Sequence, residues 1–172
     1  AYECLKETPR KVDPEVAADL DKLSSTVKNT RYQKLENFLK NQQFKEADQE
    51  TYRLMIETVG KEEGQWFDPE DFDTFPCEEL RAINQLWLDY SEGKFGFSVQ
   101  AKIYRDLGGT REYNEEVWYE FCDRVGWRSG GSWVWIDVVG DQEVLAPIAH
   151  LPSGGFEDSF SSLAQRLVTC RI

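Results

Sequence analysis

Residues 86–100 read LWLDYSEGKFGFSVQ, and this stretch says more about the fold than any other part of the chain. Its first residues are mostly large and apolar at helical spacing, and the Ser-Glu-Gly that follows predicts a turn. The Phe95-Gly96-Phe97 element then sets two aromatic rings on either side of a residue that has no side chain. Because glycine allows another backbone or a ligand to approach closely, this element favours contact with a flat apolar molecule.

Apolar residues on both sides of this stretch recur at helical spacing, which predicts an all-α fold. We expect helices at residues 13–27, 32–39, 44–59, 76–90, 97–107, 114–125 and 158–170. Asn114 is the expected N-cap of the helix that ends at Gly126. Residues 63–74 are predicted to be a loop, and residues 127–150 a long irregular loop with a short extended piece around Trp133 and Trp135. Short connections between the first helices predict an N-terminal helical hairpin ahead of a compact helical domain.

Composition limits the classes of partner. The chain has 172 residues, enough for one domain with a buried core, and its hydrophobic fraction of 40% excludes a disordered chain. Its 32 acidic and 20 basic side chains give a net charge of −12, which argues against nucleic acid and anionic membrane surfaces as partners. Because no apolar run approaches the roughly 20 residues of a spanning helix, we expect a soluble protein.

The four cysteines, Cys4, Cys77, Cys122 and Cys170, lie far apart and form no C-x-x-C pair, so a zinc site is not expected. Two disulfides are arithmetically possible, but a chain of this size does not need them. We therefore expect reduced thiols in a reducing compartment. Cys122 and Cys170 fall within apolar helical patterns, which predicts that both are in the core. Since the chain begins at Ala1 without Met, we expect a processed protein or a piece of a longer one.

Short motifs along the chain carry a family resemblance. They are Gly93–Gln100 (GKFGFSVQ) preceded by Leu86-Trp87 and Tyr90-Ser91, then Ala47–Thr51 (ADQET), Val125-Gly126-Trp127 and Ala149–Pro152 (AHLP). In this combination the chain closely resembles the Genomes Uncoupled Four family, the tetrapyrrole-binding accessory proteins of magnesium chelatase. The matches span residues 32–152, which is most of the chain.

The resemblance implies a helical domain shaped like a cupped hand, at residues 31–172, with residues 1–30 as an N-terminal extension and helix. It implies a regulatory protein that binds protoporphyrin IX and Mg-protoporphyrin IX without catalysis, in chlorophyll biosynthesis or its regulation. The implied partner is the large subunit of magnesium chelatase, whose activity the protein would stimulate. The implied location is the cytoplasm of a cyanobacterium or the chloroplast stroma of another photosynthetic organism.

The end of the chain departs from the family pattern. Chelatase-stimulating members continue after Leu-Pro with Thr, Asn and an Arg that help to hold the porphyrin and its metal. Here Ser153-Gly154-Gly155-Phe156 follows Leu151-Pro152, and this ending is more similar to that of cyanobacterial paralogues. The resemblance therefore carries over neither a magnesium ligand nor a clamp for the porphyrin carboxylates, and we assign no metal-binding residue.

A porphyrin is a wide apolar disc with two carboxylates at one edge, so its site needs aromatic and aliphatic walls and cations at the mouth. The candidate walls are Phe95, Phe97, Val99, Trp87 and Trp127, each of which could instead be ordinary core. Alternation around Gly96 favours one of the two Phe rings pointing inward and the other toward a groove. The candidate cations are Lys94, Lys102 and Arg105, with Arg124 and Arg128 as further possibilities, and each could instead be a solvated surface charge.

The AHLP match adds His150 and Leu151 to the candidate cofactor-binding residues. His150 is the single histidine, and imidazole suits axial ligation of a metalloporphyrin. A structural role, in which His150 bonds to loop backbone groups, is the favoured alternative. No residue pattern predicts catalysis. The acidic clusters at residues 62–63, 68–73, 78–79 and 115–116 fall in loops and first helical turns, where acidic residues suit the helix dipole, so we do not interpret them as glycosidase carboxylates.

Two other functions stay open at this point. The first is a bilin-binding sensor domain, because the late loop diverges; a bilin attached to Cys77 is one form of it. The second is a protein–protein interaction module that has kept the fold and lost the ligand. Its basis is the pair of amphipathic helices in the first third of the chain, which look superficially like helical-repeat units.

Overall fold

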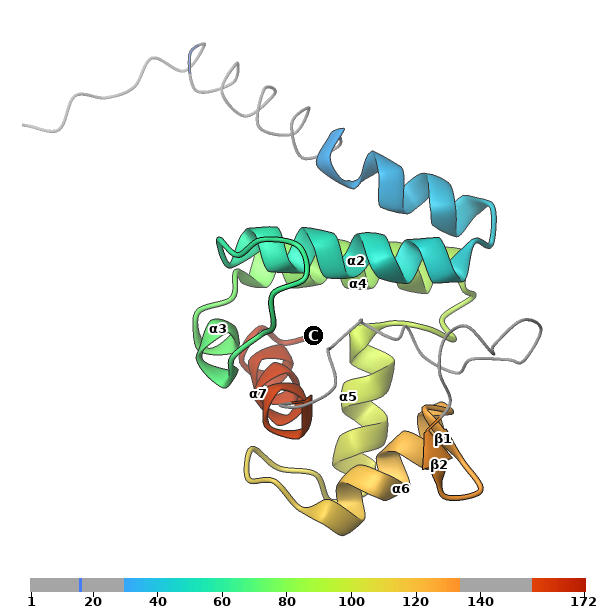
Figure 1. Ribbon diagram of the computed structural model, residues 1–172. Coiled ribbons are helices and arrows are strands. Elements are labelled where there is room, and N and C mark those ends of the chain that lie inside the picture. Colours follow the sequence, from blue (N-terminus) through green and yellow to red (C-terminus); the bar gives the residue numbers. More distant parts are fainter. Residues whose placement is uncertain (1–15, 17–29, 134–155) are drawn as a thin grey trace, which may run out of the picture. The chain divides into compact units, whose positions relative to one another are not determined.

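The computed structural model describes residue 16 and residues 30–133 and 156–172 (Figure 1). The chain divides into two units, Ala1–Lys34 and Leu35–Ile172. Residues 30–40 are helical, which confirms the helix predicted at residues 32–39. Val16 is helical, while the rest of the helix predicted at residues 13–27 lies outside the described residues.

The second unit is built from helices, which confirms the predicted all-α class. They are α2 (Phe44–Thr58), α3 (Pro69–Asp73), α4 (Cys77–Tyr90), α5 (Phe97–Asp106), α6 (Glu115–Val125) and α7 (Phe156–Thr169). Helix α5 packs against α4, α6 and α7, and α3 packs against α7 (Figure 1). Helix α5 therefore contacts three other helices of the unit.

The helix ends follow local chemistry that can be seen in the sequence. The Asn114 side chain accepts a hydrogen bond from the backbone N–H of Val117 at 3.1 Å and so caps α6. Gly126 ends α6 in the left-handed conformation, with φ at 83°, which glycine adopts without steric cost. Helix α4 begins directly after Pro76, whose ring cannot continue a preceding helix. These three boundaries confirm the predicted ones.

Helix α3 corrects the loop predicted at residues 63–74. Pro69 occupies its first turn, and the backbone N–H of Asp68 donates to Asp71 Oδ2 at 2.7 Å, so the two aspartates form a capping box. Phe72 is fully buried on its inner side. The Asp-Pro start was visible in the sequence, but a helix this short also depends on packing against α7.

A two-stranded hairpin follows α6. Strand β1 (Arg128–Ser129) pairs antiparallel with β2 (Ser132–Trp133). Gly130 and Gly131 connect the strands with φ of 59° and 81°, and the positive φ at both positions is typical of a tight hairpin turn. The predicted extended piece thus begins before Trp133, while its continuation through Trp135 lies outside the described residues.

An aromatic cluster fills the core where α5, α6 and α7 meet. Its members are Tyr104, Trp118, Phe121, Trp127 and Phe160, all 5% exposed or less. The shortest distance between ring centroids is 4.6 Å, from Phe121 to Phe160. Edge-to-face contacts at 5.4 Å join Tyr104 to Phe160 and Phe121 to Trp127. Helix α7 is thereby anchored through its first half.

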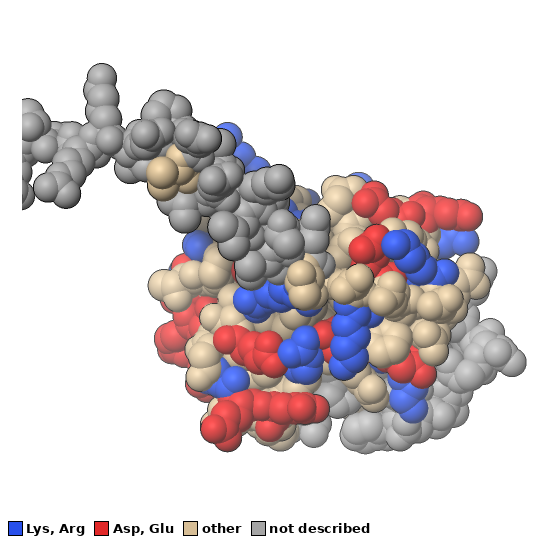
Figure 2. Space-filling model, turned by 90° about the horizontal axis from the view of Figure 1, so that it is seen from above, with Lys and Arg blue, Asp and Glu red and all other residues tan. Residues whose placement is uncertain are grey.

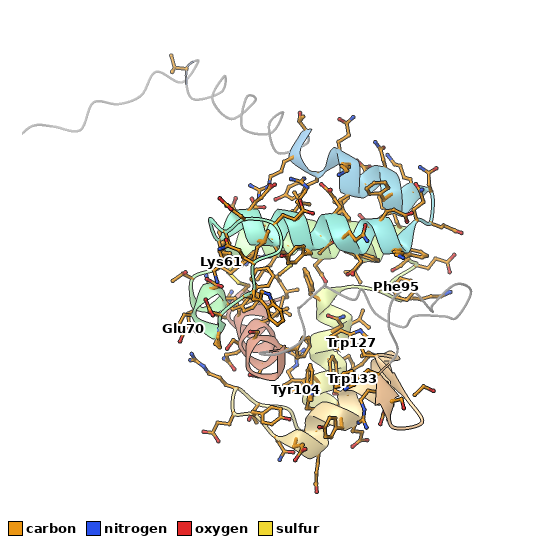
Figure 3. All side chains as sticks on the ribbon, in the orientation of Figure 1. Lys61, Glu70, Phe95, Tyr104, Trp127 and Trp133 are labelled. Carbon is orange, nitrogen blue, oxygen red and sulfur yellow. A yellow bond between two sulfur atoms is a disulfide. The ribbon has the colours of Figure 1, made fainter. Side chains whose placement is uncertain are left out.

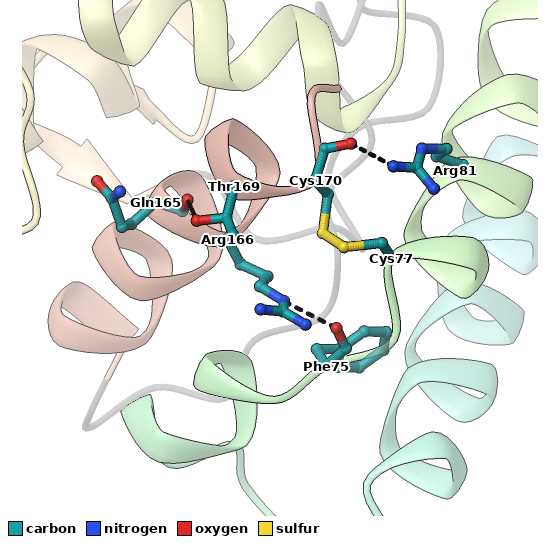
Figure 4. The surroundings of a disulfide bond; sticks show 7 residues. All are labelled: Phe75, Cys77, Arg81, Gln165, Arg166, Thr169 and Cys170. Carbon is teal, nitrogen blue, oxygen red and sulfur yellow. Dashed lines mark hydrogen bonds between the residues drawn. A yellow bond between two sulfur atoms is a disulfide. The ribbon is translucent and has the colours of Figure 1, made fainter.

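The expectation of reduced thiols is wrong for two cysteines. Cys77, the first residue of α4, forms a disulfide with Cys170, which follows α7 (Figure 4). The two residues are 93 positions apart in the sequence, and their Cα atoms are 5.2 Å apart. Nothing local in the sequence predicts this pairing, because only the docking of α7 brings the two helix ends together. Cys122 is a buried cysteine that does not take part in this disulfide, and the predicted core positions of Cys122 and Cys170 are confirmed.

Candidate functional site

The start of α5 is built around Gly96. Its φ of 154° is one that L residues rarely adopt, and a Cβ at this position would lie 2.9 Å from Asn84 Oδ1 and 3.2 Å from Leu88 Cδ2. The same Asn84 oxygen accepts a hydrogen bond from the backbone N–H of Ser98 at 2.9 Å, in the first turn of α5. Gly96 is therefore needed for the close approach of α5 to α4, as its place between two Phe residues suggested.

The turn before Gly96 is held by Ser91. The backbone N–H of Phe95 donates to Ser91 Oγ at 2.9 Å, and that of Lys94 donates to the Ser91 carbonyl at 3.0 Å. Gly93 adopts a φ of 75° and donates from its N–H to the Leu88 carbonyl at 2.9 Å. These bonds confirm the predicted Ser-Glu-Gly turn and fix the position at which Phe95 leaves it.

Phe95 and Phe97 occupy different environments. Phe97 is fully buried, whereas Phe95 is only half-buried. The Phe95 ring packs edge-on against Phe44 of α2 at a centroid distance of 5.1 Å and against Trp87 of α4 at 6.3 Å. Figure 3 shows Phe95 at the amino end of α5, apart from Trp127 and Tyr104. One ring therefore lies inside and the other at the surface, because Phe97 begins α5 while Phe95 belongs to the turn before it.

Trp87 and Trp127 lie in the interior, with exposures of 1% and 5%. The Trp87 indole N–H donates to Thr51 Oγ1 of α2 at 3.0 Å. Trp127 belongs to the aromatic cluster between α5, α6 and α7. Like Phe97, both have core positions in the structure, and their role as walls of a ligand site stays a prediction.

The remaining candidates on α5 lie toward solvent. Val99 is half-buried, as is Ile103 one turn later, while Lys102 and Arg105 are exposed. We group these side chains with Phe95 and Lys94 and call the group the α5 face: Lys94, Phe95, Val99, Lys102, Ile103 and Arg105. Around the helix axis, Lys102 lies between Val99 and Arg105, and Arg105 lies nearly opposite Ile103. Lys102 pairs with Asp106 one turn later, and Lys94 lies 3.9 Å from Glu92. Both ion pairs are exposed and weak, so they leave these cations able to meet another anion.

His150 and Leu151 lie outside the described residues, so they are not placed relative to the α5 face. Sequence reasoning did not assign Phe44, Ile103 or Asn84 to this region. Asn84 could have been noticed, because it is a polar residue on a helix face that otherwise carries Leu80, Ile83 and Trp87. Phe44 could not, because its contact with Phe95 depends on how α2 packs against α4.

The disulfide also bears on the bilin alternative. While Cys77 is bonded to Cys170, its sulfur is not a free thiol for covalent attachment of a bilin. Within residues 30–133 and 156–172, no group of three or more His, Cys, Asp or Glu side chains is placed to hold a metal ion. Among the helices of the same residues, none combines the length and the apolar character required to cross a bilayer.

Positive and negative side chains are interspersed on one face of the molecule. On the face drawn in Figure 2, Lys and Arg side chains lie among Asp and Glu side chains rather than in one basic patch. A typical example is Arg53, whose guanidinium pairs with both Glu50 and Glu57 on α2, and these bonds raise the pKa of Arg53. An anionic ligand of this acidic chain would therefore depend on a few local cations such as those of the α5 face.

Comparisons with known proteins agree on one family for this chain. A family model described as GUN4-like matches residues 25–166. The chain is 39% identical over 99 residues to a protein of Arabidopsis thaliana named "Tetrapyrrole-binding protein, chloroplastic", which covers 55% of this chain and 37% of that protein. It is 32% identical over 123 residues to a "Ycf53-like protein" of Synechocystis sp., covering 70% of this chain and 50% of that protein. The chain thus spans half or less of the length of these relatives.

A solved structure shares the fold. It is the ligand-free structure of Arabidopsis thaliana GUN4, which matches with a TM-score of 0.55 and 27% sequence identity. The match covers 80% of this chain and 94% of that chain. The resemblance found in the motifs around Gly96 is thereby confirmed by sequence and by fold.

Proposed function

Because this chain belongs to the GUN4-like family, we propose that it binds a tetrapyrrole, with a cyclic porphyrin as the ligand. The tetrapyrrole-binding name of the Arabidopsis relative supports this proposal. We further propose that residues 31–172 form the binding domain, and that the protein acts by holding and presenting the ligand rather than by catalysing a reaction. The chloroplastic relative and the one from Synechocystis support a location in the chloroplast stroma or the cyanobacterial cytoplasm.

The observation that carries the proposal is the half-buried Phe95 beside Gly96. A flat macrocycle needs an aromatic surface that is held rigidly and is still accessible. The Phe95 ring meets both conditions, since Phe44 and Trp87 pack against it and Ser91 bonds its backbone, while part of the ring faces solvent. Val99 and Ile103 extend this apolar surface along one side of α5 because residues four apart lie on the same helix face.

The cations of the α5 face suit the carboxylate edge of a porphyrin. Lys94 precedes the amino end of α5, where the helix dipole also favours an anion. Lys102 and Arg105 lie on the two following turns and are exposed. We propose that Lys94, Lys102 and Arg105 meet the propionates while Phe95 and Val99 contact the ring. His150 and Leu151 stay proposed ligand-binding residues on the basis of the AHLP match.

Stimulation of magnesium chelatase is a finer part of the proposal. The family resemblance supports it. Because the sequence after Pro152 differs from that of chelatase-stimulating members, stimulation is tested separately from ligand binding. It is tested by adding the purified chain to a reconstituted chelatase and measuring the rate of magnesium insertion into a porphyrin. A protein that binds porphyrin but leaves this rate unchanged would keep the binding function and lose the chelatase partner.

The direct experiment is a titration of the chain with deuteroporphyrin, its magnesium complex and a bilin, followed by tryptophan fluorescence and by the ligand absorption band. We expect saturable quenching and a shifted band with at least one porphyrin. Phe95→Ala should weaken binding roughly tenfold while the fold is kept. Selective binding of the bilin would identify a divergent sensor instead. No saturable response to any of the three ligands would contradict the proposal and favour a protein-interaction module.

Charge variants separate a specific clamp from general attraction. Lys94→Ala, Lys102→Ala and Arg105→Ala should each weaken binding of deuteroporphyrin by several fold, since a surface charge contact contributes up to about 1 kcal/mol. Arg171→Ala removes one exposed positive charge at the end of the chain and serves as the matched control. Equal losses for all four variants would mean that the cations of the α5 face have no specific role.

A further inference from the structure

The two cysteines of the disulfide differ in exposure. Cys77 is partly exposed at the start of α4, whereas Cys170 is fully buried. Disulfide exchange requires a thiolate to reach one of the two sulfurs, and the accessible sulfur is the one attacked. This difference favours attack of an external thiol on Cys77, with Cys170 as the leaving thiolate, over the reverse order.

The disulfide fastens the carboxyl end of α7 to the start of α4. Two hydrogen bonds join the same parts of the chain (Figure 4). Arg81 of α4 donates to the carbonyl of Cys170 at 2.6 Å, and Nε of Arg166 donates to the carbonyl of Phe75 at 2.8 Å. When the S–S bond opens, the covalent constraint across 93 residues is lost, and noncovalent contacts such as these two bonds must hold the carboxyl end of α7 without it.

The amino half of α7 has a separate anchor. Ser159 donates from Oγ to the Phe67 carbonyl at 3.0 Å, and Phe160 packs in the aromatic cluster against Phe121 and Tyr104. These contacts do not involve the disulfide. Opening the bridge therefore loosens the last turns of α7 while the core keeps its packing.

We infer that Cys77–Cys170 is a thiol–disulfide exchange site, at which a protein dithiol of the thioredoxin class opens the bridge and releases the carboxyl end of α7. The reductant thiolate attacks Sγ of Cys77, the S–S bond breaks, and Cys170 leaves as a thiolate that takes up a proton. The second thiol of the reductant then attacks the mixed disulfide and frees Cys77. The protein gains two electrons and two protons, and the reductant becomes a disulfide.

The proposed location is a compartment in which thiols are kept reduced, and this supports a regulatory role for the disulfide. Lasting disulfides are rare where thiols are kept reduced, and those that form there are mostly transient or redox-sensing. This step rests on the location proposed above, but the exchange itself requires no tetrapyrrole. It is measured on the purified chain without ligand, so its failure and a failure to bind porphyrin are distinguishable.

The chemical test traps the intermediate. The oxidised chain is mixed with a thioredoxin variant that lacks its resolving cysteine, and the adduct is located by peptide mass spectrometry. We expect a mixed disulfide on the peptide that contains Cys77 and none on the peptide of Cys170, with the same result in Cys4→Ser. Adduct formation only after unfolding with urea would show a protected structural disulfide and overturn the inference. An adduct on Cys170 would overturn the assigned order of attack.

The conformational test uses hydrogen exchange of the oxidised and the reduced chain. On reduction, amides of residues 164–170 should exchange with solvent roughly tenfold faster, because the disulfide no longer restrains local unfolding of the end of α7. Amides of residues 50–56 in α2 should change less than about twofold and serve as the internal control. The double variant Cys77→Ser/Cys170→Ser should show the fast rate with and without reductant. Equal rates in residues 164–170 before and after reduction would contradict the release of α7.

Discussion

The Trp87 indole N–H donates a hydrogen bond to Thr51 Oγ1 at 3.0 Å, and this bond joins α4 to α2 inside the core. Both residues are 1% exposed or less. Thr51 in turn donates to the carbonyl of Ala47 at 2.9 Å, so its hydroxyl is both donor and acceptor. Trp87 and Thr51 both belong to the motifs that carry the family resemblance, and the structure shows that they form one contact.

Thr51→Val should destabilise the protein by about 1 to 3 kcal/mol, because it leaves the Trp87 N–H buried without an acceptor. Thr58→Val is the matched control. Thr58 is also on α2 and also donates to the carbonyl four residues earlier, but that bond stays within its own helix. Urea unfolding of both variants measures the difference. Equal losses of stability would mean that the indole bond adds nothing.

Gly96→Ala should destabilise the protein by more than Gly93→Ala does. Both glycines have positive φ, so each substitution strains the backbone, by about 1 to 2 kcal/mol at Gly93 and by about 1 to 3 kcal/mol at Gly96, whose φ of 154° and ψ of 153° are confined almost entirely to glycine. At Gly93 a Cβ would meet nothing within 4 Å, whereas at Gly96 it would lie 2.9 Å from Asn84 Oδ1. We expect a further loss of about 1 to 3 kcal/mol from this overlap, measured by thermal or urea unfolding. A Gly96 variant no less stable than the Gly93 variant would show that α5 can shift away from α4.

Phe97→Ala should destabilise the protein more than Phe95→Ala does. Phe97 is fully buried, so its truncation should cost about 3 to 5 kcal/mol of unfolding free energy. Phe95 is half-buried, and its truncation should cost clearly less. Urea unfolding of both variants in the absence of ligand provides the measurement. A larger loss for Phe95→Ala would reverse the assignment of the inner and the outer ring.

Asp48 should make stability depend on pH. Its side chain is 2% exposed, and within the described part of the chain neither carboxyl oxygen has a hydrogen-bond partner. Burial raises the pKa of Asp48 well above its usual 3.8. Between these two values the folded protein holds a proton that the unfolded chain releases. The free energy of unfolding contributed by Asp48 therefore falls as the pH rises through this window, and levels off above the folded-state pKa.

Asp48→Asn should remove this fall, so the stability of the variant relative to wild type should increase with pH across the window. Urea unfolding between about pH 4 and pH 8 measures it. Asp89→Asn, an exposed carboxylate on α4, is the control and should follow the wild-type profile. Parallel profiles for Asp48→Asn and wild type would show that the buried carboxyl is solvated or paired.

Much of the local structure could be predicted because its causes are local. The recurrence of apolar residues at helical spacing predicted α2, α4, α5 and α6, since an amphipathic helix buries one face whichever element packs against it. Asn114 and Gly126 predicted the two ends of α6 because capping and the left-handed conformation depend on single residues. The exception was α3, whose five residues are too short to give a period.

Within the candidate site the sequence by itself determined the turn at Ser91, the need for glycine at 96 and the presence of two aromatic rings beside it. Which ring is buried, which helices pack against Phe95 and which cysteines meet were decided only by the tertiary structure. Phe44, Phe95 and Trp87 come from three separate segments, and Cys77 lies 93 residues from Cys170. A contact between distant segments depends on how whole helices dock, and no residue pattern within one helix records its partner.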